Sequence, residues 1–314
     1  IVYDAEAVFA ERTIREAALA GTPLSEWRQQ RLLRAELRMT EIAEAIVAVS
    51  ASERARIAQV TGRRVRLLGY GAELAPTPMP FAARSDLLFL GALRDEATPN
   101  GDSLRYFVRE VMPQFAGPDG MRLRIAGAGT DRAAWLTGYG GPQVDIVGPV
   151  DALAPLFERA RVFIAPTRFA AGIPIKVIDA ARHGVPVVAS SLVAGQLGWR
   201  NGVELLTADT APEFAAACVA LHSGRALWAR GGGRVGEQAV GRLERAAMAE
   251  SHTSHDIGQR DDVGVAARPI GAAATRNDLL GSDRERRQAE AAGVARQIGG
   301  ALGRFLELAV VLVV

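Results

Sequence analysis

The sequence predicts an α/β fold with Rossmann-like, doubly wound parallel sheets, and two observations lead to that prediction. From residue 86 to residue 222, short segments rich in Val, Ile and Leu alternate with segments of helical spacing. Glycine and proline residues separate these segments and keep the connections short. Alternating units of this kind form a parallel sheet with right-handed crossovers, and ligands bind at the carboxyl ends of its strands.

Length and composition are those of a globular protein with about two domains. The chain has 314 residues, of which 49% are hydrophobic and 23% charged. The formal net charge is only +2, and acidic and basic residues are mixed, so we expect no binding of nucleic acid. The single cysteine, Cys218, excludes an internal disulfide. Without an 18-residue apolar span or a signal peptide, we expect a cytoplasmic location.

Residues 1–80 predict the end of a first α/β domain that lacks its opening strands, so we expect a fragment. A strand and a polar loop come first, and apolar residues then recur at helical spacing from Trp27 to Ile42. Strands are expected at residues 45–49 and 64–68, with Ser50 and Ser52 as candidate N-caps of the helix between them. Three prolines within residues 75–81 predict an extended linker, and we place the domain boundary there.

A second domain is expected over residues 81–235. Its expected strands are 86–91, 121–126, 144–147, 162–164, 185–188 and 203–207, and its expected helices are 103–114, 152–160, 175–183 and 212–222. After about residue 236 the periodicity is lost, and the only element expected in the tail, 236–314, is a polar helix at 284–296. No role is assigned to this tail.

The segment 161–190, RVFIAPTRFAAGIPIKVIDAARHGVPVVAS, predicts a strand, a glycine-bearing loop, a helix and a second strand. Such a loop directs backbone N–H groups and the positive end of a helix at the same point, so an anion is the expected ligand. Gly172 allows close approach of the backbone, and Lys176, the only lysine of the chain, lies one turn into the helix. The alternatives are that Gly172 only breaks the chain and that Lys176 is a solvated surface residue.

This segment resembles the donor-binding region of the retaining glycosyltransferases of family 4, which have the two-domain GT-B fold. The family pattern of an acid, seven residues and a second acid, aligned on GVPVV, places Asp179 on the second acidic position and Ala171 on the first. The resemblance implies a nucleoside-diphosphate sugar as donor, no metal ion or other cofactor, and a glycan or lipid-linked acceptor. It also implies that the full-length protein contacts a membrane surface.

The resemblance also implies roles for individual residues of this loop and helix. The backbone N–H groups of Ala171, Gly172 and Ile173, together with Lys176, would contact the diphosphate. Asp179 would accept hydrogen bonds from the ribose. An ion pair between Asp179 and Lys176 is the structural alternative.

Two further positions bear on the donor site. Ala171 cannot bind sugar hydroxyls, so either their recognition would pass to backbone groups and Arg168, or the donor preference differs, or catalysis is lost. In the loop after Gly91, Ala92 stands where the family often has an arginine, and Arg94 would substitute for it or be an ordinary surface residue. No catalytic residue is named.

Other chemistries have little support in the sequence. It contains no H-E-x-x-H, no G-x-S-x-G and no D-x-D of the metal-binding kind. Gly127 and Gly129 are better explained by a turn than by a dinucleotide fingerprint, and His183 is expected to cap a helix. Because of Ala171 and Ala92, a nucleotide-sugar binding module without turnover remains the main alternative to a glycosyltransferase. An epimerase or phosphorylase of the same fold is a third.

Overall fold

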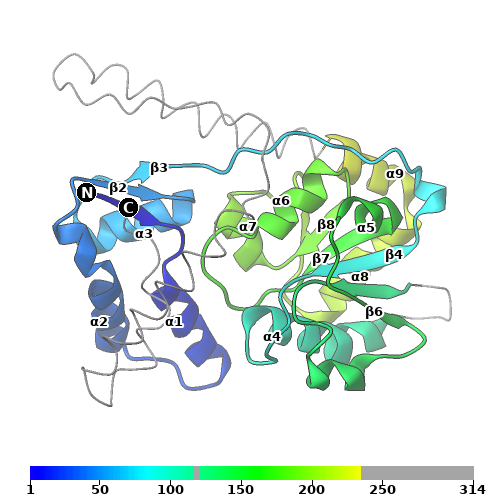
Figure 1. The fold of residues 1–314 in the computed structure, drawn as a ribbon, viewed down its shortest axis with the longest axis horizontal. Coiled ribbons are helices and arrows are strands. Elements are labelled where there is room, and N and C mark those ends of the chain that lie inside the picture. The colour runs from blue at the N-terminus through cyan, green and yellow to red at the C-terminus, as the bar shows by residue number, and fades with distance from the viewer. Residues whose placement is uncertain (116–120, 235–314) are drawn as a thin grey trace. The chain divides into compact units, whose positions relative to one another are not determined.

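The computed structural model describes residues 1–115 and 121–234, which contain two parallel β-sheets (Figure 1). The smaller sheet has the strand order β1-β2-β3, and the larger one has the order β6-β5-β4-β7-β8-β9. All neighbouring strands in these sheets are parallel. When the larger sheet is numbered from its own first strand, its order is 3-2-1-4-5-6, the doubly wound Rossmann arrangement. The predicted fold class is therefore confirmed.

The first sheet and its helices occupy residues 2–67. Its elements are β1 (Val2–Ala5), α1 (Phe9–Leu19), α2 (Glu26–Glu36), β2 (Ala45–Ala48), α3 (Ala51–Thr61) and β3 (Arg66–Leu67), with a 3₁₀ turn at Leu37–Glu41. The polar loop expected after the first strand is in fact α1, which packs Ala10 and Ile14 onto the core. Trp27 and Ile42, the two ends of the series with helical spacing, are 65% and 60% exposed.

One of the two candidate N-caps is confirmed, and the proline-rich segment has no helix or strand up to Pro80, while the domain boundary placed there stays a prediction. The Ser50 hydroxyl accepts a hydrogen bond from the Glu53 N–H and caps α3, so Ser50 rather than Ser52 is the N-cap. Residues 68–80 contain no helix or strand. Within them, Ala75 and Thr77 donate backbone hydrogen bonds to carbonyls at the end of α6, which explains how a proline-rich segment is held without secondary structure.

The larger sheet follows the predicted alternation. Its strands are β4 (Asp86–Leu90), β5 (Leu123–Ala126), β6 (Val144–Gly148), β7 (Ala160–Ala165), β8 (Val187–Ala189) and β9 (Leu206–Thr207). Its helices are α4 (Pro99–Tyr106), α5 (Ala154–Arg159), α6 (Ile175–Arg182), α7 (Ser191–Leu197), α8 (Ala211–Ser223) and α9 (Arg225–Ala229). Short π and 3₁₀ turns extend α4 through Phe107–Val111 and Met112–Gln114. Neither α7 nor α9 was predicted, and in α7 a glycine, Gly195, interrupts the apolar pattern.

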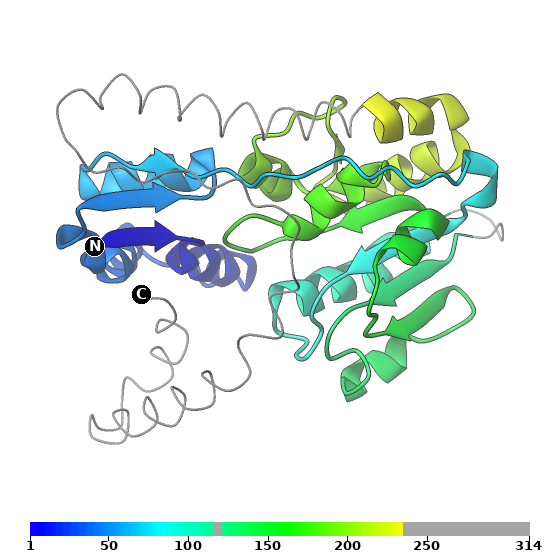
Figure 2. The same ribbon diagram turned by 45° about the horizontal axis from the view of Figure 1, so that its top comes forward.

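Helices cover both faces of the larger sheet (Figure 1, Figure 2). Leu88 and Leu90 of β4 pack with α5, α6 and α7, whereas Leu87 and Phe89 pack with α4 and α8. All five residues of β4 are buried, as expected for a central parallel strand. Cys218 is fully buried on α8, where it packs as a small core residue.

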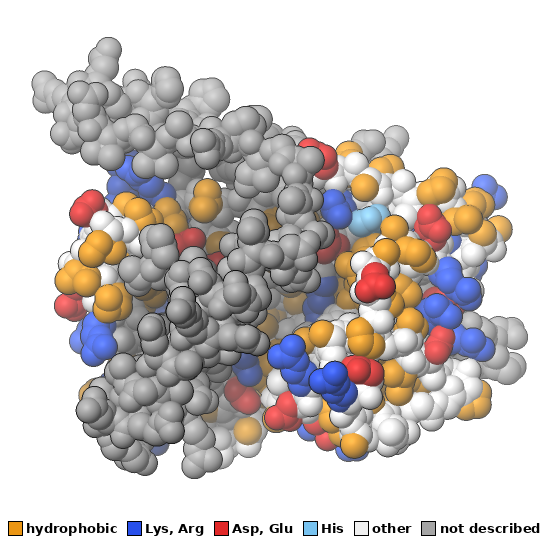
Figure 3. Space-filling model, viewed as in Figure 1, with side chains coloured by type: hydrophobic (Ala, Val, Ile, Leu, Met, Phe, Trp, Pro, Cys, Tyr) orange, Lys and Arg blue, Asp and Glu red, His pale blue; other side chains and the backbone are white. Residues whose placement is uncertain are grey.

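Charged side chains of both signs share the surface of the described residues. On the face shown in Figure 3, acidic and basic side chains are interspersed over the described residues. Within residues 1–115 and 121–234, no helix has the length and apolar character needed to cross a membrane. The expected loss of periodicity at 236–282 and the expected helix at 284–296 lie outside the described residues.

Candidate functional site

The carboxyl edge of the larger sheet has a topological switch point between β4 and β7. From β4 the chain winds outward to β5 and β6, then returns to β7 on the other side of β4. The loops after β4 and β5 are in close backbone contact there, because a Cβ on Gly127 would lie 2.1 Å from the Gly91 carbonyl oxygen. Gly127 and Gly129 therefore serve a tight turn, as expected, and the loops that leave β4 and β7 diverge at the place where ligands bind in such sheets.

Lys176 joins the two sides of this switch point. From the first turn of α6, its Nζ donates a hydrogen bond of 2.6 Å to Asn100 Oδ1, at the start of α4. The ammonium also lies 4.8 Å from the ring centroid of Phe89. Asn100 in turn donates to the Ala92 carbonyl, in the loop after β4. The Lys176 ammonium group therefore lies between the loop that leaves β4 and the loop that leaves β7.

The electrostatics of Lys176 distinguish it from a surface lysine. Burial lowers the pKa of its ammonium group to about 8. Among the residues that the structure describes, Lys176 forms no ion pair. This half-buried cation, which has no counter-ion among those residues, lies in the first turn of α6 and beside the first turn of α4. An anion bound next to it would be stabilised by the ammonium group and by both helix ends. The alternative that Lys176 is a solvated surface residue is wrong.

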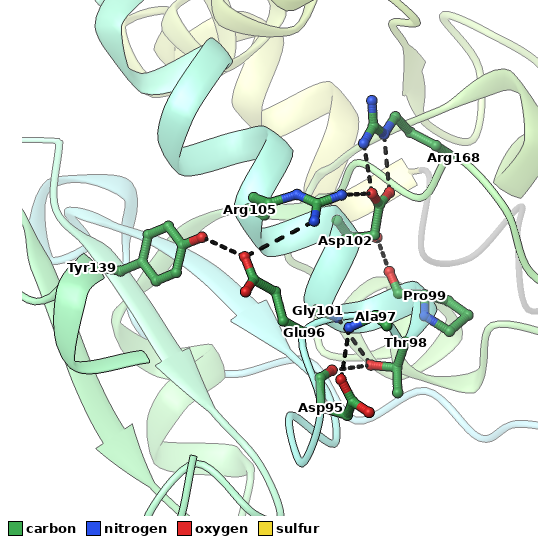
Figure 4. A network of polar contacts seen from close by, with 11 residues as sticks. Asp95, Glu96, Ala97, Thr98, Pro99, Gly101, Asp102, Arg105, Tyr139 and Arg168 are labelled. Atoms are coloured by element: carbon green, nitrogen blue, oxygen red, sulfur yellow. Dashed lines mark hydrogen bonds and ion pairs between the residues drawn. The ribbon is translucent and has the colours of Figure 1, made fainter. Parts of the chain in front are cut away.

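Arg168, in the loop after β7, is held by a carboxylate of α4 (Figure 4). Its Nε and one terminal nitrogen lie 3.0 Å and 2.6 Å from the two oxygens of Asp102, which is only 3% exposed. Arg105 donates to the same carboxylate, and the Arg168 guanidinium lies over the Tyr106 ring. These contacts fasten the loop to α4, a role that the sequence did not reveal. Whether Arg168 also contacts a sugar stays a prediction.

The start of α4 therefore supplies the side chains that bind both Lys176 and Arg168. Thr98 caps the helix through a hydrogen bond from the Gly101 N–H, and Pro99 occupies its first turn. Asn100 and Asp102 then present their side chains to Lys176 and Arg168. Neither residue was named as a site residue, and the helix begins at Pro99, four residues before the expected start at 103.

Gly172 lies where the loop after β7 meets the first sheet. Its backbone has φ of +79°, a conformation that favours glycine, and a Cβ would lie 3.0 Å from the Glu6 carbonyl oxygen. Its N–H donates a hydrogen bond of 3.0 Å to Glu53 Oε1. The N–H expected to contact a diphosphate is therefore bonded to a carboxylate in this structure.

Asp179 lies on α6, three residues after Lys176, but does not pair with it. Its Oδ1 is 3.0 Å from Arg182 Nε, so the alternative of an ion pair with Lys176 is wrong. Burial raises the pKa of Asp179, and the charges of Arg182 and His183 only partly offset the effect. His183 ends α6 and bonds to the Asp179 carbonyl through Nδ1, which confirms its predicted capping role.

The remaining predicted residues lie around this site with different orientations. Arg94 is exposed and packs its stem beside Gly129. Ile173 packs its side chain against the core, and Ala171 is half-buried. Gly91 lies against the Asn100 side chain. Among the residues that are described, no cluster of His, Cys, Asp or Glu could hold a metal ion.

Comparison with known proteins finds a family match over the larger sheet, which carries the candidate site. The family model described as "Glycosyl transferases group 1" matches residues 84–223, which span the larger sheet. No curated protein sequence matches this chain.

The solved structures that resemble this chain cover a larger part of it than the family model does. Sucrose-phosphate synthase from Thermosynechococcus elongatus has a TM-score of 0.60 at 19% identity, over 82% of this chain and 67% of its own. Anabaena Alr3699/HepE in complex with UDP-glucose has a TM-score of 0.61 at 15% identity, over 81% of this chain and 72% of its own.

A third similar structure is S. aureus TarM bound to fondaparinux, alpha-GlcNAc-glycerol and UDP, with a TM-score of 0.57 at 12% identity over 74% of this chain. This chain spans only 47% of that protein's length. These identities establish the shared fold and nothing finer. The described residues have the GT-B fold of glycosyltransferases.

Proposed function

We propose that the chain contains the donor site of a glycosyltransferase, which transfers a sugar from a nucleoside-diphosphate sugar to a glycan or lipid-linked acceptor. Retention of the anomeric configuration and independence from metal ions are part of this proposal. The observation that carries it is Lys176, a half-buried cation at the switch point of the sheet for which residues 1–115 and 121–234 supply no counter-ion. UDP or UDP-glucose in complexes of proteins with the same fold supports it.

The chemistry of the proposed reaction needs a cation at this place. When the bond between the anomeric carbon and the diphosphate breaks, negative charge grows on the leaving phosphate oxygen. Lys176 and the amino ends of α4 and α6 would stabilise this charge more in the transition state than in the ground state. No residue is needed to bind a metal ion if the ammonium group neutralises the diphosphate. Asp179, further along α6, would accept hydrogen bonds from the ribose.

The experiment that tests the proposal is donor binding and sugar transfer by the full-length protein. UDP-glucose, UDP-N-acetylglucosamine and GDP-mannose would be titrated by calorimetry into wild type, Lys176→Met and Arg132→Met. Loss of the ammonium should weaken donor binding about tenfold or more, because a charge-assisted contact contributes about 1.5–3 kcal/mol. Arg132 is an exposed residue, with 90% of its side chain accessible, and its replacement should change nothing.

The type of reaction is tested on the product. An α-linked donor should give an α-linked product in nuclear magnetic resonance spectra, and an excess of EDTA should leave the rate unchanged. A β-linked product would contradict retention, and loss of activity with EDTA would contradict independence from metal ions.

A second candidate function is donor binding without turnover. Ala171 favours it, because alanine offers no acceptor for sugar hydroxyls. Donor binding by calorimetry, without transfer to any acceptor and without slow hydrolysis of the donor, would identify this function.

A further inference from the structure

Glu53 connects the first sheet to the loop that follows β7. It lies in the first turn of α3 and is 9% exposed. Its Oε1 accepts hydrogen bonds from the Val8 N–H at 3.1 Å and the Gly172 N–H at 3.0 Å, and its Oε2 accepts one from the Ser50 hydroxyl. One carboxylate therefore binds the connection between β1 and α1 and the glycine loop at the same time.

This arrangement differs from an ordinary helix start with the same residue pattern. At α8 the Thr210 hydroxyl accepts from the Glu213 N–H, and the Glu213 carboxylate accepts from the Thr210 N–H, which closes a capping box. At α3 only the first half is present, because the Glu53 carboxylate reaches other partners. Its contacts are thus not explained by the stability of its own helix.

The burial of Glu53 has a cost that its hydrogen bonds must offset. Burial raises the pKa of the carboxyl group, whereas the bonds from Val8, Gly172 and Ser50 lower it. Glu36 already binds the Phe9 and Ala10 N–H groups at the start of α1. Glu53 adds the bond from the neighbouring Val8 N–H and the contact with Gly172, 119 residues along the chain.

We propose that Glu53 is a positioning residue for the loop 166–174, which it holds in the conformation that receives the nucleotide sugar. This inference rests on the proposed donor site. It reassigns the Gly172 N–H from contact with the diphosphate to anchoring of the loop, and leaves Lys176 as the main contact of the diphosphate. Close packing supports it, because at Gly172 even a methyl group would crowd the Glu6 carbonyl.

Hydrogen–deuterium exchange of peptides covering residues 166–174, without any donor, tests the anchoring directly. Glu53→Ala should speed exchange of the Gly172 amide about tenfold, equivalent to about 1.4 kcal/mol. Glu53→Gln should stay close to wild type, because its amide oxygen can accept both N–H groups and its NH₂ group can donate to Ser50.

Glu36→Ala is the matched control. It also removes a carboxylate that accepts two backbone N–H groups, but those groups lie at the start of α1 and not in the loop after β7. This variant should speed exchange at the start of α1 and leave residues 166–174 unchanged. Equal exchange of the loop in all three variants and wild type, or equal effects of Glu53→Ala and Glu36→Ala, would overturn the inference.

Donor kinetics test the second half of the proposal. With the donor that wild type binds best, Glu53→Ala should raise KM for the donor about tenfold, with Glu53→Gln and Glu36→Ala within about twofold of wild type. Tighter donor binding by Glu53→Ala would mean that the carboxylate competes with the diphosphate, and positioning would be refuted. If wild type binds no sugar nucleotide, the proposed function fails, whatever the loop does. If it binds one and the loop does not respond, only the inference about Glu53 fails.

Discussion

Raising the pH from about 7 to about 9 should weaken donor binding about tenfold through the titration of Lys176. The ammonium has a pKa of about 8 in the donor-free protein because burial disfavours its charge. It is then about nine-tenths protonated at pH 7 and about one-tenth protonated at pH 9. If only the charged form attracts the diphosphate, the apparent affinity falls in proportion, which corresponds to about 1.4 kcal/mol.

The assay is calorimetric titration with the sugar nucleotide in buffers from pH 6.5 to pH 9, at constant ionic strength. A sugar diphosphate ester is suitable because, unlike free UDP, it has no phosphate group that titrates in this range. Two buffers with different ionisation enthalpies would report the proton that Lys176 takes up on binding above pH 8. Uptake should approach one proton as the pH rises.

The control is Lys176→Arg, whose guanidinium stays charged over the whole range. Its absolute affinity can differ, because arginine is larger and must reach Asn100 differently. Its pH dependence should nevertheless be flat, apart from any titration of the nucleotide base, which affects both proteins alike. The same decline in wild type and Lys176→Arg would refute the reasoning.

Three other predictions concern the loop, the ribose and Arg84, the buried arginine just before β4. Gly172→Ala should weaken donor binding and speed exchange of residues 166–174, since φ of +79° and the Glu6 carbonyl at 3.0 Å both oppose a side chain; unchanged values would contradict the close approach. Asp179→Asn should cost about 1–3 kcal/mol of affinity for a nucleoside diphosphate but nothing for its 2′,3′-dideoxy analogue, as measured by calorimetry. Arg84→Ala should lower the free energy of unfolding in urea by about 3–5 kcal/mol, because Arg84 is 2% exposed and donates to the Met79, Phe157 and Ala160 carbonyls. Arg132→Ala is its control, and a similar loss there would show that the effect does not depend on the buried contacts.

The strands of the larger sheet were predictable because their signal is local. All five residues of β4 are buried, and the four after Asp86 form a continuous apolar run that ends at Gly91. The helix before G-V-P-V-V was also predictable from a local signal, because glycine and proline mark its end. The order of the strands followed from the general rule for alternating units and not from any single residue.

Helices α1 and α7 were both missed. In α1, Ala10 and Ile14 face the core, but the intervening acidic and basic residues make the segment resemble a polar loop. In α7, Gly195 lowers the helical tendency, and the helix depends on the Ser190 cap and on the burial of Val193 and Leu197. Tertiary packing overrides local preference in both helices.

The contacts that build the candidate site could not be predicted, because each joins residues far apart in the chain. Lys176 and Asn100 are 76 residues apart, Arg168 and Asp102 are 66 apart, and Gly172 and Glu53 are 119 apart. Residue type still gave a partial signal for Lys176, since a single lysine among many arginines draws attention to its position. Asp102 and Glu53 had no such signal, because acidic residues in a first helical turn ordinarily interact with their own helix.

The two helix starts at α3 and α8 show where local reasoning ends. Both carry a hydroxyl residue followed three positions later by glutamate, and in both the hydroxyl caps the helix. The glutamate of α8 closes on its own backbone at the exposed surface, whereas Glu53 turns to Val8 and Gly172. The pattern therefore determines where a helix begins, but the surroundings determine what the carboxylate binds. Glu53 is buried although it lies in the sequence pattern of a cap. For that reason, its replacement best separates the positioning of the loop from the stability of the helix.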